Sequence, residues 1–229
     1  LRKPNGYSPM SQRFIPLILI ATLLAACSAT APIKPANSSR GDYAHTQRYL
    51  TWLIEKEMAD NEVTGLSVAL IDDHQLVWAY GFGYSDAENK IPATAQTPYR
   101  MGSIAKIMTA SAAMRMAERG QIDIDQPFSR YLPAFSIKSR FASAEPVTPR
   151  NIMTHHSGLP SNYLKGMTDS NPKYFATLAD DIKDEHVAYP PNYIFAYSNL
   201  GMTLLGAAIE QASGQDYGSY MEQSFFRPL

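Results

Sequence analysis

Only two segments of this 229-residue chain have the pattern of a β-strand, and they are neighbours in the sequence. Residues 65–71 and 76–83 are apolar, β-branched and aromatic runs, and the polar turn at 72–75 between them predicts a hairpin. A two-stranded hairpin is marginally stable on its own in water. Either a helix covers it, or it pairs with strands beyond the given residues. Because nothing after residue 100 has a strand pattern, we expect the second arrangement.

Helical periodicity predicts most of the remaining regular structure. Apolar residues recur every three or four positions in several segments, and Gly120, Gly158 and Gly214 are placed to end three of them. Residues 84–98 have no period and are expected to be a loop. The result is a mixed α/β (α+β) chain with one helix, a hairpin and a long helical stretch. The predicted helices cover residues 43–61, 103–120, 148–158 and 200–213.

Charge and cysteine content exclude several classes of function. The chain has 20 Lys and Arg against 21 Asp and Glu, which provides no basic field for binding nucleic acid. Its single cysteine, Cys27, cannot form an internal disulfide or a multi-thiolate zinc site. His155 and His156 are adjacent, so they would not share one face of a helix, and we expect them to be structural. No metal or organic cofactor is predicted.

The first 42 residues have the organisation of a targeting signal followed by a flexible tether. Positive charges precede an apolar run at 14–26, which is typical of a secretory signal peptide covering residues 1–26. Leu24-Ala25-Ala26-Cys27 resembles a bacterial lipobox, in which the cysteine is lipidated, although a stray cysteine is the alternative. Residues 27–42 are rich in Ala, Ser, Thr and Pro and are expected to form a flexible tether.

These features predict a protein anchored by lipid at the bacterial cell envelope and facing the periplasm. In lipoproteins that this motif resembles, Asp after the cysteine often signals retention at the inner membrane. Ser28 stands there instead, which favours the outer membrane. The folded domain is then expected to comprise residues 43–229.

Gly102-Ser103-Ile-Ala-Lys106 is the strongest candidate for catalysis. An S-x-x-K spacing at the start of a helix places serine and lysine one turn apart on the same face. The helix start also favours developing negative charge, as an oxyanion would require. Taken alone, the motif more often marks a capping serine followed by a surface lysine one turn on. A second match, Ser170-Asn-Pro-Lys173, is interpreted as a turn and dismissed.

Tyr197-Ser-Asn199 is the second candidate, just before the predicted helix at 200–213. A phenol beside a lysine ammonium has a lowered pKa and can accept or relay a proton. Asn199 could hydrogen-bond the lysine or a substrate amide. Alone, this motif more often marks a core tyrosine followed by a helix cap.

Taken together and in order, the motifs resemble the serine β-lactamase and penicillin-binding-protein superfamily, in its class C and esterase branch. The segment Met101–Met108 resembles the nucleophile motif, and Tyr197–Asn199 resembles the Y-x-N motif. Residues 151–160 resemble a "LLTHxSGL" segment, and Phe82–Asp86 with Thr97–Arg100 resemble the lead-in to the nucleophile. The resemblance runs from about Val63 to Leu229 and implies a sheet flanked by helices, joined to an all-helical subdomain.

The resemblance implies a role for each site residue. Ser103 would be the acylated nucleophile, Lys106 and Tyr197 would share the base and acid roles, and Asn199 would position substrate. Which of Lys106 and Tyr197 takes the serine proton stays open.

The sequence departs from the family pattern at two places. The third motif, K-T-G or H-x-G on a late strand, is absent from its expected position, so we expect the C-terminal strands of the sheet to be missing from this chain. His156-Ser-Gly158 matches the string but precedes Tyr197, and we interpret it as a decoy. Pro190-Pro191-Asn192 stands where many relatives have P-G.

The sequence therefore predicts a cell-envelope serine hydrolase that acts on an ester or amide through an acyl-enzyme on Ser103. β-Lactams, D-amino-acid peptides and simple esters are all candidate substrates, and peptidoglycan-like material is a candidate partner. The alternative is a lipoprotein that binds penicillin or peptidoglycan without turnover, or an inactive fragment. The sequence does not predict an oligomeric state.

Overall fold

The computed structural model describes residues 30–228, apart from 38, 143, 167–168 and 172. It comprises two compact units, Leu1–Tyr99 and Arg100–Leu229, which we describe separately. The predicted signal peptide and Cys27 lie outside the described residues. The described part of the predicted tether, from residue 30 to 42, contains no helix or strand.

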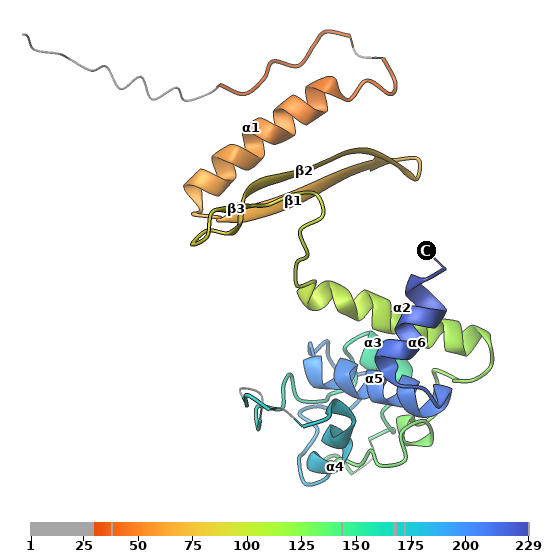
Figure 1. Ribbon diagram of the computed structural model, residues 1–229. Helices are drawn as coiled ribbons and strands as arrows, with labels where there is room; N and C mark the ends of the chain where they lie inside the picture. Colours follow the sequence, from red (N-terminus) through yellow and green to blue (C-terminus); the bar gives the residue numbers. More distant parts are fainter. Residues whose placement is uncertain (1–29, 38, 143, 167–168, 172, 229) are drawn as a thin grey trace, which may run out of the picture. The chain divides into compact units, whose positions relative to one another are not determined.

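The first unit is a helix beside a small antiparallel sheet (Figure 1). Helix α1 (Ala44–Asp60) precedes β1 (Gly65–Asp72), β2 (Gln75–Asp86) and β3 (Ile91–Pro92), and the sheet order is β1-β2-β3. The hairpin is confirmed, with Leu66 opposite Phe82. The prediction of loop for 84–98 was wrong where β2 continues and β3 pairs with it, because a two-residue strand has no detectable period.

The second unit is helical, as predicted. Residues 102–104 form a 3₁₀ turn, η1 (Gly102–Ile104), so α2 (Ala105–Glu118) begins two residues later than expected. Among the described residues the remaining elements are η2 (Phe128–Arg130), α3 (Pro149–Met153), η3 (Phe175–Thr177), α4 (Leu178–Asp181), α5 (Asn199–Ser213), α6 (Tyr217–Met221) and η4 (Glu222–Phe226).

Helix caps explain where α3 and α5 begin and end. Thr148 caps α3 in a reciprocal capping box with Asn151, and Ser198 caps α5 by accepting from the Gly201 N–H at 2.9 Å. Gly214 ends α5 in the left-handed conformation, as predicted. The prediction that the third helix extends to Gly158 was wrong, because His155 already has a positive φ of 58°.

Helix α5 is the centre of the core of this unit. Leu204, Leu205 and Ile209 are fully buried in it, and Met116 of α2 belongs to the same core. Small residues on both helices, including Ala112, Ala113 and Ala208, let the backbones approach closely. The packing therefore fixes α2, which begins next to Ser103, against α5, which begins next to Tyr197.

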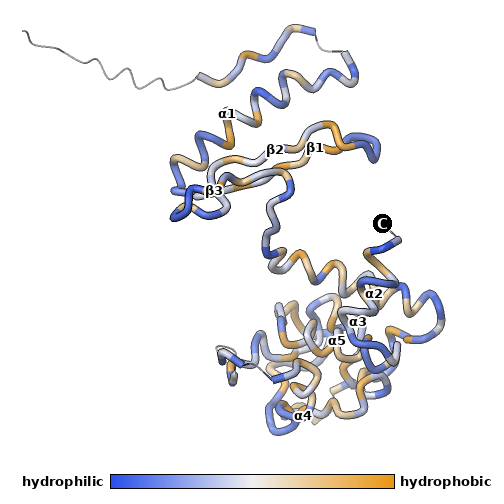
Figure 2. The backbone as a smooth tube through the Cα atoms, viewed as in Figure 1, coloured by the Kyte–Doolittle hydropathy of each residue, from blue (hydrophilic) through white to orange (hydrophobic). Residues whose placement is uncertain are grey.

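Hydropathy is mixed along the helices of the structure. In α1, hydrophobic and hydrophilic residues alternate (Figure 2). None of the helices within the described residues has both the length and the hydropathy required to cross a bilayer.

Candidate active site

Ser103 lies in the 3₁₀ turn η1 that leads directly into α2. The turn begins at Gly102, which has a φ of +53°, a conformation that favours glycine. This bend exposes Ser103 at the start of the helix. At such a start the backbone N–H groups lack helical partners and favour negative charge nearby.

Lys106 and Tyr197 both lie within hydrogen-bond distance of Ser103. Nζ of Lys106 donates to Oγ of Ser103 at 3.2 Å, one turn along the helix. The phenol of Tyr197 donates to the same Oγ at 2.7 Å, although the two residues are 94 positions apart. The structure thus brings together the three residues that the sequence singled out for catalysis.

The positive charge of Lys106 acts on the phenol. Nζ lies 5.0 Å from the centroid of the Tyr197 ring, a cation–π distance. Hydrogen bonding by Lys106, and then by Ser103, lowers the pKa of Tyr197 below its usual 10.0. A lowered pKa increases the fraction of Tyr197 that is phenolate near neutral pH, and the phenolate is the form that can accept the proton of a serine hydroxyl.

Asn199 is the first residue of α5 and binds a partner that the sequence did not indicate. Its side-chain amide donates to Oδ1 of Asn162 at 2.8 Å. Asn162 lies two residues after the family-like segment at 151–160, so none of the motifs pointed to it. Asn199 lines the same cavity as Gly102 and Lys106, and the paired carboxamides can hydrogen-bond an amide or carbonyl of a ligand.

Two cavities adjoin this group of residues. One of about 290 Å³ is lined by Gly102 and Lys106, and one of about 340 Å³ is lined by Asn162 and Tyr174. Asn199, Phe175 and Thr203 line both. Volumes of this order suit a small-molecule ligand.

His155 contacts Tyr197 and was not predicted as a site residue. The centroids of the two rings are 4.4 Å apart. Burial, together with the charges of Lys106 and His156, lowers the pKa of His155 below its usual 6.5. The sequence showed only two adjacent histidines. The contact of His155 with Tyr197, about 40 residues further along the chain, cannot be deduced from spacing.

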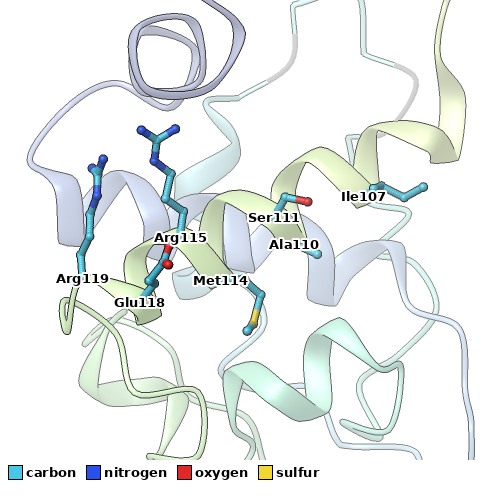
Figure 3. A pocket seen from close by; sticks show the side chains of 7 residues that line it. All are labelled: Ile107, Ala110, Ser111, Met114, Arg115, Glu118 and Arg119. Atoms are coloured by element: carbon cyan, nitrogen blue, oxygen red, sulfur yellow. The ribbon is translucent and has the colours of Figure 1, made fainter. Parts of the chain in front are cut away.

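A shallow hollow along α2 does not have this chemistry. Figure 3 shows it lined by Ile107 and Met114, with Arg115, Glu118 and Arg119 at one end. Its hydroxyl group belongs to Ser111, and the hydrogen bonds between described residues include none from Ser111 to a base. Throughout the described residues, no cluster of three or more His, Cys, Asp or Glu side chains is suited to a metal ion.

The structure explains the local conformation of the His156-Ser-Gly158 string and of Pro190-Pro191-Asn192. Gly158 of the His156-Ser-Gly string has a φ of +71°, and its Cα faces the carbonyl of Tyr189 so closely that no side chain fits. Gly158 of this string therefore serves to let the backbone approach the carbonyl of Tyr189 closely. Asn192 adopts a φ of +65°, a left-handed conformation that Asn tolerates, and its Oδ1 accepts from Asn151 at 2.7 Å. Asn192 thus supplies at this turn the left-handed backbone conformation for which glycine is the usual residue.

Comparison with known proteins agrees with this geometry. "Protein flp" of Staphylococcus aureus (strain NCTC 8325 / PS 47) is 25% identical over 186 residues, which is 80% of this chain and 37% of flp. The octameric penicillin-binding protein homologue from Pyrococcus abyssi has a TM-score of 0.66 and 34% identity, covering 78% of this chain and 42% of its own. EstCE1, described as a hydrolase with promiscuous acyltransferase activity, has a TM-score of 0.68 and 25% identity, covering 76% of this chain and 49% of its own.

The match extends over most of this sequence but over only part of each relative. The chain spans 37% of the length of flp and 40% of "Beta-lactamase-like protein 2" from Dictyostelium discoideum. Residues 50–229 match the Beta-lactamase family, and this segment contains all of the residues assembled around Ser103. This chain is therefore a member of the Beta-lactamase family, and its fold and motifs are those of the serine β-lactamase and penicillin-binding-protein superfamily.

Proposed function

We propose that this chain is a serine hydrolase that forms an acyl-enzyme on Ser103. The observation that carries the proposal is the position of one hydroxyl between two proton-handling groups, with Tyr197 at 2.7 Å and Lys106 at 3.2 Å. Membership of a family of serine hydrolases supports it.

The proposed reaction has two halves. Oγ of Ser103 attacks the carbonyl carbon while its proton passes to the Lys106–Tyr197 pair, and the carbonyl oxygen becomes an oxyanion at the start of α2. When the oxyanion collapses, the bond to the leaving group breaks and the pair returns the proton to the leaving oxygen or nitrogen. Water then hydrolyses the acyl-enzyme by the same route.

The proposed substrates are small esters and amides, including β-lactams and D-amino-acid peptides. The carboxamides of Asn162 and Asn199 can donate to a substrate carbonyl and accept from a substrate amide. EstCE1, described as a hydrolase with promiscuous acyltransferase activity, supports acyl transfer as the class of reaction.

A fluorophosphonate probe tests the mechanism directly, because it forms a covalent bond with an activated serine. We expect intact-mass analysis to show one adduct on the folded chain and none on Ser103→Ala. Ser170→Ala is the matched control, because Ser170 belongs to the other S-x-x-K string and should leave labelling unchanged. Labelling that survives in Ser103→Ala, or no adduct on a chain folded by circular dichroism, would refute the proposal.

Turnover separates a hydrolase from a protein that only binds penicillin. We expect nitrocefin or p-nitrophenyl acetate to be hydrolysed with many turnovers per chain, and the rate to fall by about 10³-fold or more in Ser103→Ala. A stable adduct with no turnover would support the binding role instead.

We also propose that the protein is anchored by lipid on Cys27 at the cell envelope, facing the periplasm, in the outer membrane rather than the inner. The lipobox-like sequence before Cys27 and the apolar run at 14–26 support this. We expect metabolic labelling with a palmitate analogue in a bacterial host to be lost in Cys27→Ser. Equal labelling of the two proteins would contradict the anchor.

A further inference from the structure

Tyr197 is placed by a segment that has no regular structure of its own. It lies two residues before α5, and its side chain is 39% exposed. A phenol on such a segment would sample several rotamers, yet the 2.7 Å contact with Ser103 requires one of them. Something outside the segment must hold it.

His155 binds three consecutive residues of that segment. Its backbone carbonyl accepts from the N–H of Ala196 at 2.8 Å. Its ring Nδ1 accepts from the N–H of Ser198 at 3.3 Å. Between these two hydrogen bonds, its ring packs against the ring of Tyr197 with centroids 4.4 Å apart. One residue thus fixes the backbone on both sides of Tyr197 and the side chain itself.

The backbone of His155 is adapted to this task. Its φ of +58° is uncommon for a residue other than glycine and turns the chain away from α3. Asn and His tolerate this conformation better than most residues with side chains. The strain is offset by the contacts to residues 196–198, which a right-handed continuation of the helix would not provide.

We infer that His155 is a positioning residue that holds the phenol of Tyr197 against Ser103, and that it does so as a neutral imidazole with Nδ1 as the acceptor. The catalytic meaning of this inference rests on the proposed function, but the positioning itself does not. Because Ser198 donates to Nδ1, the ring proton must be on Nε2.

Protonation of His155 should release the segment. An imidazolium has a donor at both ring nitrogens, so Nδ1 can no longer accept from Ser198. The charged groups facing the ring are Lys106 on α2 and the neighbouring His156, and Tyr197 is the other titratable group packed against it. Both Lys106 and His156 disfavour a cation at His155, as burial does, so the neutral form persists below the usual pKa of 6.5.

NMR of the full chain, with ¹⁵N-labelled histidine and ¹³C-labelled tyrosine, tests the positioning without any substrate. We expect the ¹⁵N shifts of His155 to show the Nε2–H form at neutral pH. The Ser198 amide and the Tyr197 ring should then shift with the same midpoint as His155 as the pH falls. His156, whose Nδ1 contacts the carbonyl of Thr154, is the internal control. Resonances of Tyr197 and Ser198 that ignore the titration of His155 would overturn the inference.

Variants extend the test to chemistry. His155→Asn keeps an acceptor and tolerates the positive φ, whereas His155→Phe keeps a ring without an acceptor. We expect the fluorophosphonate labelling rate to fall by about 10²-fold in His155→Phe, as for misplacement of a reacting group by roughly 1 Å, and by less in His155→Asn. His156→Phe should leave the rate unchanged.

The two failures can be distinguished. A wild-type chain that is not labelled, but whose Tyr197 and Ser198 signals follow His155, would refute the proposed function and support the positioning role. A labelled chain whose His155→Phe variant reacts as fast as wild type would refute the positioning role alone. If His155→Phe does not fold, the titration of the wild-type chain still decides.

Discussion

Replacing Tyr197 by Phe is expected to slow the acylation of Ser103 by about 10²–10⁴-fold, the range observed for loss of a general acid or base. The substitution removes one oxygen and keeps the ring, so the contact with His155 should survive. Stopped-flow measurement of acylation by a chromogenic ester, with thermal unfolding as the folding control, provides the test. A loss below tenfold would show that the phenol is not in the proton path.

Lys106→Met should cost a similar factor, and the double variant little more than either single one. Both groups contact the same Oγ, and the pair passes one proton, so the two losses cannot be independent. A double-mutant cycle on the acylation rate measures this coupling. Losses that multiply would indicate two separate roles.

The pH dependence follows from the charge of Lys106. The phenol works as a base when deprotonated, so acylation should rise with pH and level off above the pKa of Tyr197. Because Lys106 lowers that pKa, the midpoint should lie below 10.0. In Lys106→Met the largest cause of the lowered pKa is lost, and the midpoint should move upward. A midpoint that moves downward in Lys106→Met would contradict this effect of Lys106 on the phenol.

Gly158→Ala is expected to lower the free energy of unfolding by about 3–4 kcal/mol, the combined cost of a left-handed alanine and of overpacking. A Cβ at Gly158 would lie 1.9 Å from the carbonyl oxygen of Tyr189 and 2.8 Å from its carbonyl carbon. Both atoms are backbone, so no side-chain rotation relieves the clash. Urea unfolding monitored by circular dichroism measures the loss.

Gly120→Ala is the matched control for that measurement. Gly120 has nearly the same φ, +69° against +71°, but a Cβ there meets nothing within 4 Å. Its substitution should therefore cost only the conformational part, about 1–2 kcal/mol. Equal losses at the two glycines would show that the contact with Tyr189 relaxes freely.

The elements next to the proposed catalytic residues were predictable because their signals are local. Thr148, Ser198 and Gly214 mark helix ends by their own side-chain or backbone chemistry. The motifs at Ser103 and Tyr197 each lie at the start of a helix, and the packing of α2 against α5 brings those starts together. The two motifs taken together, in their order, could therefore predict that Ser103 and Tyr197 lie side by side, which neither motif predicted alone.

The remaining features depend on contacts between distant residues. The hydrogen bond between Asn162 and Asn199 and the ring contact of His155 with Tyr197 join positions about 40 residues apart, and no periodicity in the sequence indicates them. Strand β3 is defined only by its partner. The third helix was predicted too long because the positive φ of His155 is set by the segment it binds, not by its neighbours in the chain.

The backbone bonds that reach from the turn at 155–158 to the loop before Tyr197 have a consequence for divergence within the family. The N–H groups of Ala196, Asn192 and Ala188 donate in succession to the carbonyls of His155, His156 and Gly158. These hydrogen bonds are closely spaced along the segments 155–158 and 188–196, so an insertion or deletion in either segment would displace Tyr197. Length variation among relatives should instead accumulate between these two segments, around residues 162–178. Several residues there line the larger of the two cavities that adjoin Asn199. A change at this place would alter ligand preference and leave the contacts of Tyr197 with Ser103 intact.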